Sequence, residues 1–199
     1  EDAWVGNPLE KSCQANADLI ISLNASPFQS GKSQQRFDLY RQHALKWGVD
    51  LLYVNSVGGQ DELVFDGGSF MMSAKGKIIQ QLPFFESCQV LHSKPCAHTD
   101  LSETALTYKA LVLATKDYVC GNGFAGSLIG LSGGIDSALT LAIAVDALGA
   151  ENVSAVMMPY QFTSDMSLED AEGQAKTQGV HYSSVDIHQM VTAFNMSLF

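Results

Sequence analysis

The chain has 199 residues, of which 46% are hydrophobic and only 16% are charged, and its formal net charge is −10. A chain of this length and composition can bury a hydrophobic core, which excludes an intrinsically disordered protein. The longest apolar run, residues 138–145, is too short to cross a bilayer, and no charged and apolar leader pattern is present. We therefore expect no membrane segment, a cytoplasmic location and reduced cysteines.

The charge is distributed unevenly along the sequence. Residues 1–98 carry 8 Lys and Arg against 10 Asp and Glu, whereas residues 99–199 carry 3 against 11. No arginine follows Arg41. A nucleic-acid-binding protein needs clustered cations, so we expect no nucleic-acid partner. A phosphate site in the second half would have to rely on backbone amides or on a metal ion.

The first half predicts a sheet covered by a long helix. Residues 18–24 predict a buried strand, and apolar residues at helical spacing predict a helix that ends at Gly48. Further strands are expected at residues 51–55, 63–65, 69–73 and 78–82. The last three should be antiparallel, with turns at residues 66–68 and 75–77.

A polar stretch without periodicity, residues 86–102, predicts a domain boundary. It contains Cys88, His92, Cys96 and His98. Because their spacing matches no common zinc finger, we favour a linker over a zinc site. Asp100 and Glu103 are expected to cap the next helix. The apolar face of that helix and its end are predicted to be Leu106, Ala110, Leu113, Ala114 and Gly121.

The second half alternates strands and helices. Strands are expected at residues 127–131, 153–158 and 182–187, with a helix at residues 137–148 and another opened by Ser167 and Asp170 as a capping box. This order predicts βαβ crossovers and a parallel, doubly wound sheet. Three strands are few for such a sheet, and the sequence starts without Met, so we expect it to be part of a longer protein.

A glycine-containing loop joins the first of these strands to its helix. It comprises Gly130, Leu131, Ser132, Gly133, Gly134, Ile135, Asp136 and Ser137. Glycines lack Cβ and helix N-termini present unpaired amides, so this order favours an anion site. The two serines can donate to phosphate oxygens, and Asp136 would hold a magnesium ion. A tight turn that only caps the helix is the plainer alternative, and the absence of lysine excludes the common P-loop.

The segment SGGIDS, residues 132–137, resembles the pyrophosphate loop of the N-type ATP pyrophosphatases. Residues 157–171 resemble the corresponding stretch of glutamine-dependent NAD synthetases. The resemblance implies that residues 130–137 bind ATP, with Asp136 as the metal ligand. Ser164, Ser167 and the two methionines at 157 and 158 receive no firm role, since they are equally typical of turns, caps and a core.

The resemblance extends to the first half. Enzymes of that family carry a nitrilase-like glutaminase domain with a Glu, Lys and Cys catalytic set, and residues 1–4, EDAW, resemble the segment after the nucleophilic Cys. The nucleophile is thus expected just before Glu1, and no catalytic residue is assignable in this chain. The match at residues 24–32 implies that Ser26 and Lys32 bind the substrate glutamine. A plain turn and a solvated helix-start charge are the alternative for this pair.

Taken together, the resemblance implies an α/β protein with two parts. Residues 1–90 would be the C-terminal part of a nitrilase-like αββα glutaminase domain, residues 91–102 a linker, and residues 103–199 the start of an ATP-pyrophosphatase domain, similar to adenine nucleotide alpha hydrolases. The implied activity is amidation of deamido-NAD to NAD, with ATP and magnesium, by a homo-oligomeric ligase of NAD biosynthesis. A pyrophosphatase for a different acyl substrate and a non-catalytic nucleotide-binding module remain the alternatives.

Overall fold

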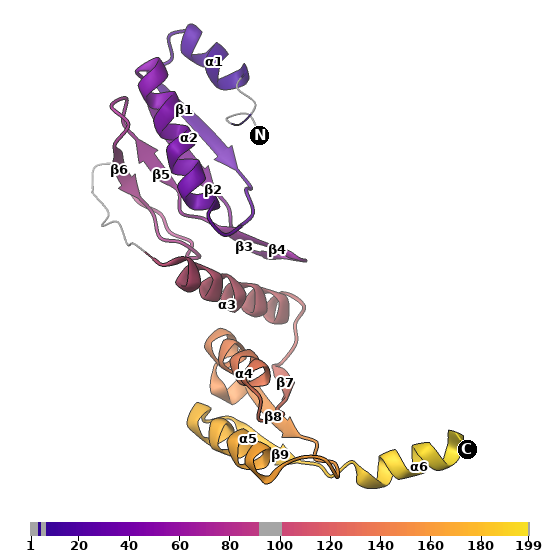
Figure 1. The fold of residues 1–199 in the computed structure, drawn as a ribbon. Coiled ribbons are helices and arrows are strands. Elements are labelled where there is room, and N and C mark those ends of the chain that lie inside the picture. The colour runs from indigo at the N-terminus through magenta and orange to yellow at the C-terminus, as the bar shows by residue number, and fades with distance from the viewer. Residues whose placement is uncertain (1–3, 5–6, 92–100, 199) are drawn as a thin grey trace. The chain divides into compact units, whose positions relative to one another are not determined.

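The computed structural model describes residues 4, 7–91 and 101–198, and these form two compact units. The first unit extends to Ala114 and the second begins at Thr115 (Figure 1). The first unit contains the following helices and strands: α1 (Asn7–Gln14), β1 (Leu19–Asn24), α2 (Lys32–Trp47), β2 (Asp50–Asn55), β3 (Val57–Gln60), β4 (Leu63–Asp66), β5 (Phe70–Met72), β6 (Ile78–Gln81) and the first part of α3 (Glu103–Gly121).

The main sheet of the first unit has the order β1-β2-β5-β6. Strands β1 and β2 are parallel, whereas β2, β5 and β6 are antiparallel neighbours. The predicted strand at residues 63–65 is present as β4, but β4 pairs with β3 in a separate two-stranded sheet. The turn at residues 66–68 therefore joins two sheets, which the sequence pattern did not show because β3, with the sequence VGGQ, is short and rich in glycine.

Helix α2 covers one face of this sheet (Figure 1). Its buried residues Phe37, Tyr40 and Ala44 repeat at helical spacing and pack in one cluster with Leu51 and Phe70 of the sheet. The Tyr40 and Phe70 rings meet edge to face with centroids 5.3 Å apart. Burying each of the Phe and Leu side chains stabilises the fold by about 1.5–3 kcal/mol. Gly48 ends the helix in the left-handed conformation, as predicted.

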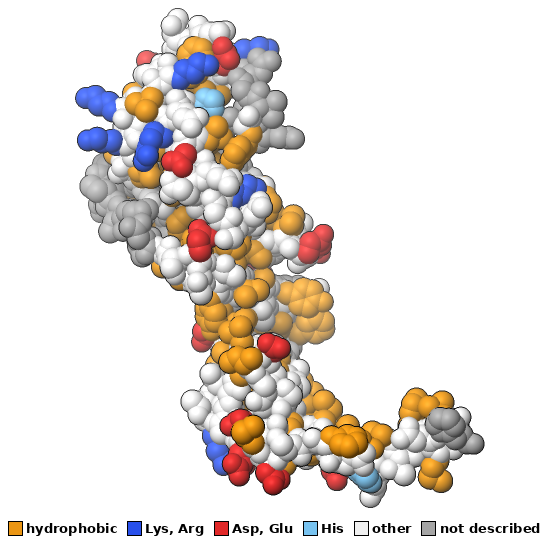
Figure 2. All heavy atoms as spheres, viewed as in Figure 1, with side chains coloured by type: hydrophobic (Ala, Val, Ile, Leu, Met, Phe, Trp, Pro, Cys, Tyr) orange, Lys and Arg blue, Asp and Glu red, His pale blue; other side chains and the backbone are white. Residues whose placement is uncertain are grey.

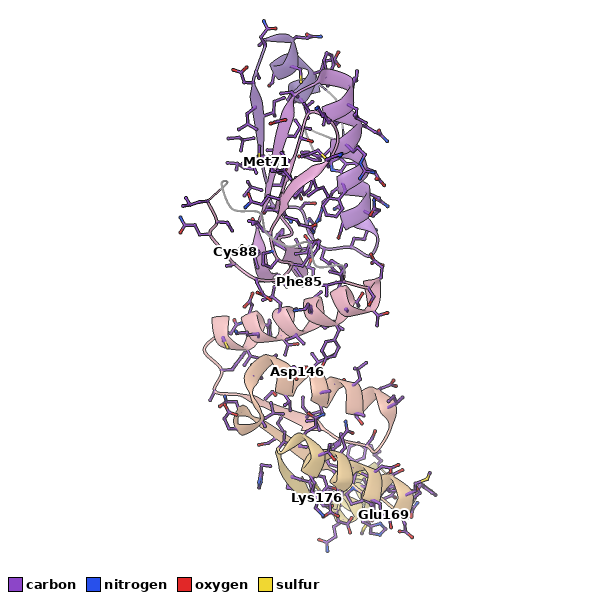
Figure 3. The ribbon with its side chains drawn as sticks, turned by 90° about the vertical axis from the view of Figure 1, so that its left-hand side faces the viewer. Met71, Phe85, Cys88, Asp146, Glu169 and Lys176 are labelled. Atoms are coloured by element: carbon purple, nitrogen blue, oxygen red, sulfur yellow. The ribbon has the colours of Figure 1, made fainter. Side chains whose placement is uncertain are left out.

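The opposite face of the sheet is open over much of its area. Leu19, Ile21 and Leu23 of β1 are 42%, 57% and 79% exposed, so the prediction of a buried strand is wrong for this face. Met71 and Cys88 line an apolar cleft of about 420 Å³ on this side (Figure 3). A continuous apolar run such as LIISLN is typical of a strand whose two faces are both covered, which explains the prediction.

Helix α3 spans Glu103–Gly121; its end agrees with the prediction, but its start lies two residues later than a cap at Asp100 would give. Leu106 and Ala110 are buried in the core of the first unit. Ser102 caps the helix through a bond from the Ala105 amide to its hydroxyl, 3.2 Å long. The predicted partner Asp100 lies outside the described residues, and the Glu103 carboxylate binds Ser30 and Gly31.

The second unit is a three-stranded parallel sheet with the order β7-β8-β9, as the alternation predicts. After the end of α3 it contains β7 (Ser127–Gly130), α4 (Ile135–Leu148), a 3₁₀ turn (Ala150–Asn152), β8 (Val153–Met157), α5 (Asp165–Gln178), β9 (His181–Ser184) and α6 (His188–Leu198). Helix α6 was not expected. The core lies between the sheet and helices α4 and α5, around Leu131, Leu141, Ala155 and Ala171.

The start of α5 differs from the prediction. Its N-cap is Ser164, whose hydroxyl accepts a hydrogen bond of 3.2 Å from the Ser167 amide. The capping box of Ser167 and Asp170 is therefore wrong by one turn. The same spacing of three residues fits Ser164 with Ser167, and periodicity alone does not distinguish two such pairs.

Two further observations concern the described residues only. No helix in this part of the chain is long and apolar enough to cross a membrane. No group of three or more His, Cys, Asp and Glu side chains within it is arranged to hold a metal ion.

Candidate functional site

The glycine loop, residues 130–137, leaves the carboxyl end of β7 and enters α4. Leu131 is 1% exposed and its amide donates to the Val156 carbonyl, so the first residue after the strand is anchored in the sheet. Gly134 is the N-cap of α4. The loop therefore delivers the positive end of a helix dipole to the carboxyl edge of a parallel sheet, where ligands bind in folds of this kind.

The serines of this loop bind each other. The Ser137 hydroxyl donates to the Gly134 carbonyl over 2.9 Å and accepts from the Ser132 amide over 3.2 Å. The Ser132 hydroxyl lies 3.1 Å from that of Ser137 and accepts from the Gly134 amide over 3.3 Å. Both hydroxyls thus hold the loop in shape, and they would have to turn to donate to a phosphate.

Gly133 is required for packing. It has a φ of 81°, and a Cβ at this position would lie 2.3 Å from the carbonyl oxygen of Ser167. The glycine loop consequently rests against the first turn of α5. Gly134, with a φ of −86°, has no such restriction.

A cleft of about 370 Å³ lies beside the glycine loop. It is lined by Gly130, Leu131, Ser132, Val156, Met157, Met158, Phe162, Thr163, Ser164 and Ser167. One wall is apolar and the other carries four hydroxyl groups, a combination suited to a ligand with an apolar ring and phosphates. No sequence pattern assigns a firm binding role to Ser164 or Ser167, and none selects Thr163 or Phe162. The sequence feature that could have identified these residues is their position directly after β8, because β8 is the neighbour of β7, which carries the glycine loop.

Asp136 occupies the first turn of α4 and is exposed. A single carboxylate at an open site can hold magnesium when phosphate oxygens and water complete the octahedron. The residues present therefore fit a magnesium ion that arrives with a nucleotide.

The second unit holds few cations around this cleft. Lys and Arg side chains gather over the first unit, whereas acidic side chains predominate on the visible face of the second (Figure 2). The cations of the described second unit are Lys116 and Lys176, and Lys176 pairs with Glu172 over 2.6 Å on the outer face of α5 (Figure 3). Anion binding in this cleft would thus depend on amides, hydroxyls and a metal ion.

The Ser26 loop, residues 24–32, leaves the carboxyl end of β1 and enters α2. Ser26 and Lys32 line one cleft of about 490 Å³, so the structure brings these two predicted residues together. Asn24 and Gln35 line the same cleft. A hydroxyl and an ammonium on one wall can bind the polar groups of an amino acid.

A buried polar network lies beneath the Ser26 loop, and the sequence analysis missed it. Arg36 and Asp66 are 2% and 0% exposed and form a salt bridge of 2.7 Å. Asn55, 7% exposed, donates to Asp66 and to the Ser26 carbonyl. Burial raises the pKa of the neighbouring Tyr53 to about 12, against the smaller opposing effect of the Arg36 charge.

The predicted Cys and His cluster is only partly visible. Cys88 is exposed, whereas His92, Cys96 and His98 lie outside the described residues.

A glycine loop between a parallel strand and a helix, with a second hydroxyl-lined loop after the neighbouring strand, is an arrangement typical of phosphate-binding α/β proteins. Comparisons with known proteins specify the class further. Residues 107–198 match the family model described as NAD synthase.

The whole chain is similar to glutamine-dependent NAD(+) synthetases. The relative from Acinetobacter baylyi is 43% identical over 208 residues, which cover 100% of this chain and 38% of the relative. The relative from Synechocystis sp. is 39% identical and covers 96% of this chain. A solved structure of the Acinetobacter baumannii enzyme, described as a complex with ADP, superposes with a TM-score of 0.93 at 43% identity over 99% of this chain.

The resemblance inferred from the sequence is therefore confirmed over both units. The chain spans about two fifths of the length of these relatives, 38% and 36% of the two curated proteins and 39% of the solved one.

Proposed function

We propose that this chain belongs to a glutamine-dependent NAD synthetase and contributes parts of both of its active sites. Residues 1–90 would serve the nitrilase-like αββα glutaminase domain, residues 91–102 would link the domains, and residues 103–199 would begin the ATP-pyrophosphatase domain. The compact units divide within α3, after Ala114, because the first turns of this helix pack on the first core. The observation that carries the proposal is the pair of loops at the carboxyl ends of β1 and β7, in a chain similar to these enzymes along its whole length.

The glycine loop would bind the triphosphate of ATP. The cleft beside the glycine loop is lined by hydroxyl groups and by the apolar residues Met158 and Phe162, which suit an adenine ring, and the N-terminus of α4 lies at the end of this loop. Asp136 would hold magnesium, which supplies charge neutralisation for the phosphates. The similar Acinetobacter baumannii enzyme is described as a complex with ADP, which supports an adenine nucleotide as a ligand.

The reaction proceeds in two steps. The carboxylate of deamido-NAD attacks the α-phosphorus of ATP, which gives an acyl-adenylate and pyrophosphate. Ammonia then attacks the acyl carbon and displaces AMP. The main contribution of this chain is electrostatic, because the amides of the loop, and its hydroxyls once they turn toward the phosphates, stabilise the negative charge that develops on the departing pyrophosphate.

Glutamine would be the source of ammonia. Ser26 would donate a hydrogen bond to glutamine, and Lys32 would pair with its carboxylate at the cleft they share. The family resemblance also implies a homo-oligomer and a closed route for ammonia, since free ammonia would be lost to water.

The test is pyrophosphate release by the protein expressed from its complete gene. With ATP, magnesium, deamido-NAD and either glutamine or ammonia, we expect equal amounts of pyrophosphate, AMP and NAD. Asp136→Asn should lower both the glutamine-dependent and the ammonia-dependent rates at least 100-fold, since a neutral amide is a poor magnesium ligand. Pyrophosphate release only with a different acid would favour another ATP pyrophosphatase. No release, together with an unaffected Asp136→Asn variant, would leave a non-catalytic nucleotide-binding module.

A further inference from the structure

Ser26 is held by an arginine that the sequence gives no reason to select. Arg36 lies on α2, four residues after Lys32, and is 2% exposed. Its Nη2 atom lies 3.2 Å from each of three acceptors: the Ser26 carbonyl, the Ser26 hydroxyl and the Pro27 carbonyl. One guanidinium nitrogen is thus devoted to the Ser26 loop.

The other guanidinium nitrogen is anchored on a buried carboxylate. Arg36 Nη1 donates to both oxygens of Asp66, at 2.9 Å and 2.7 Å. Asn55 joins the two sides, because it donates to Asp66 over 2.9 Å and to the Ser26 carbonyl over 3.1 Å. Its own amide oxygen accepts from the Ser26 backbone over 2.8 Å. The position of Ser26 is therefore fixed at its amide, its carbonyl and its side chain.

The Arg36 contact also sets the hydrogen-bonding direction of the Ser26 hydroxyl. A guanidinium has only donors, so Ser26 Oγ must act as the acceptor in this contact. Its own hydrogen then remains for another partner. A serine that binds an amide carbonyl or a carboxylate of a substrate must donate, so Arg36 keeps Ser26 in the form that the proposed site needs.

A purely structural role for the ion pair is the competing explanation. A buried ion pair is weak evidence for stability, because well-packed apolar residues of similar volume often stabilise equally well or better. A role in core stability alone would not explain why Arg36 makes three contacts to the Ser26 loop, which borders the cleft. The arrangement instead has the features of a preorganised site, in which side chains packed behind the binding residue fix its geometry.

We infer that Arg36, anchored by Asp66, is a positioning residue of the glutamine site that fixes Ser26 and keeps its hydroxyl as a donor to glutamine. This inference rests on the proposed function. Arg36 and Lys32 would divide two tasks on one face of α2. Lys32 would contact glutamine at the cleft, whereas Arg36 would contact only Ser26 and fix the position of its hydroxyl.

The experiment compares two reactions of the same full-length protein: NAD formation with glutamine and NAD formation with ammonia. In Arg36→Lys, one ammonium cannot replace the fork that binds Asp66 and the loop together. We expect kcat/KM for glutamine to fall at least 10-fold, while kcat/KM for ammonia changes less than twofold. Arg41→Lys is the matched control, because Arg41 lies on the same helix and donates to the Gly76 carbonyl. It should leave both reactions within twofold.

A double-mutant cycle with Ser26→Ala tests whether Arg36 acts through Ser26. If it does, Arg36→Lys should add less than threefold to the loss already caused by Ser26→Ala. Should Arg36→Lys fold poorly, the paired variant Arg36→Met with Asp66→Leu removes both buried charges at once. It should show the same selective loss with glutamine.

Two outcomes would overturn the inference while the glutamine site stands. In the first, Ser26→Ala lowers kcat/KM for glutamine but Arg36→Lys does not. In the second, the loss of kcat/KM in the double variant equals the product of the two single losses. If Ser26→Ala and Lys32→Ala both leave glutamine use within twofold, the glutamine site itself fails and the inference with it.

Discussion

The two loops of this chain occupy equivalent places in their sheets but are held by different forces. The Ser26 loop lies over buried, charged residues that are distant in sequence. The glycine loop is held by its own serines and by close backbone packing on Ser167. The difference suits the proposed ligands. A loop for a triphosphate must not bring a buried carboxylate near the anion, whereas a loop for an amino acid can rest on a neutral ion pair.

The largest effect is expected where the Ser26 loop depends on buried charge. Asp66→Asn removes the countercharge of Arg36, so we expect the free energy of unfolding of the first unit to fall by about 3–5 kcal/mol. Hydrogen exchange of the β2 and β5 amides would measure it. The control is Asp38→Asn, since Asp38 pairs with Arg41 at 3.8 Å in an exposed position and should cost less than about 1 kcal/mol. If Asp66→Asn and Asp38→Asn lowered the free energy of unfolding equally, the Ser26 loop would not depend on buried charge.

The glycine loop should be destabilised by any side chain at Gly133, because this residue lies against the backbone of Ser167. In Gly133→Ala the methyl group meets the Ser167 carbonyl and the positive φ is unfavourable, so we expect a loss of about 2–3 kcal/mol in the second unit. Ammonia-dependent NAD formation should fall more than 10-fold, because the loop must move from α5. Gly173→Ala is the control, since a Cβ there meets open space within α5. It should stabilise the helix slightly. A fully active Gly133→Ala variant would contradict the packing role.

Alkaline titration should destabilise the first unit through Tyr53. The folded state holds the pKa of Tyr53 at about 12, above its ordinary value of about 10, so folding favours the protonated phenol. The contribution is fully present below pH 10. Between pH 10 and 12 the unfolded chain binds fewer protons than the folded one, so stability falls by roughly 1 kcal/mol per pH unit.

Thermal unfolding across pH 9–12 would measure this slope. Tyr53→Phe should make it shallower, and a slope unchanged by Tyr53→Phe would contradict the assignment. Tyr40, whose pKa is also raised by burial, should account for part of the remainder.

The smallest effect is expected at a single hydroxyl of the second unit. Ser164→Ala removes the N-cap of α5 and should cost about 1 kcal/mol, measured by urea denaturation. Thr177→Ala is its control, because the Thr177 hydroxyl bonds only the Gly173 carbonyl within the exposed helix surface. That variant should change stability by less than about 0.5 kcal/mol. A larger loss at Thr177 than at Ser164 would contradict the capping role.

The comparison also shows how far the sequence could predict the site. The glycine loop is visible in the sequence because its residues are consecutive and its chemistry is local. The contact of the loop with Ser167 cannot be predicted from the sequence, because a close approach of two backbone segments does not depend on a recognisable residue pattern.

The network under the Ser26 loop was invisible for a stronger reason. Ser26, Asn55 and Asp66 are separated by 29 and 11 residues, and Arg36 alone is indistinguishable from a solvated helix charge. Strand pairing failed in a similar way. The sequence marked β4 correctly, but its partner β3 contains two glycines and no alternation, and only tertiary packing selects it.

Strand β1 has a consequence for the behaviour of this polypeptide in solution. It is an edge strand of the sheet formed by the described residues, and its side chains Leu19, Ile21 and Leu23 are exposed. Such an edge is a template for strand addition. At high concentration, this polypeptide should form oligomers whose size grows with ionic strength, since salt screens its net charge of −10. A lysine at Ile21 would be the smallest change that keeps it monodisperse.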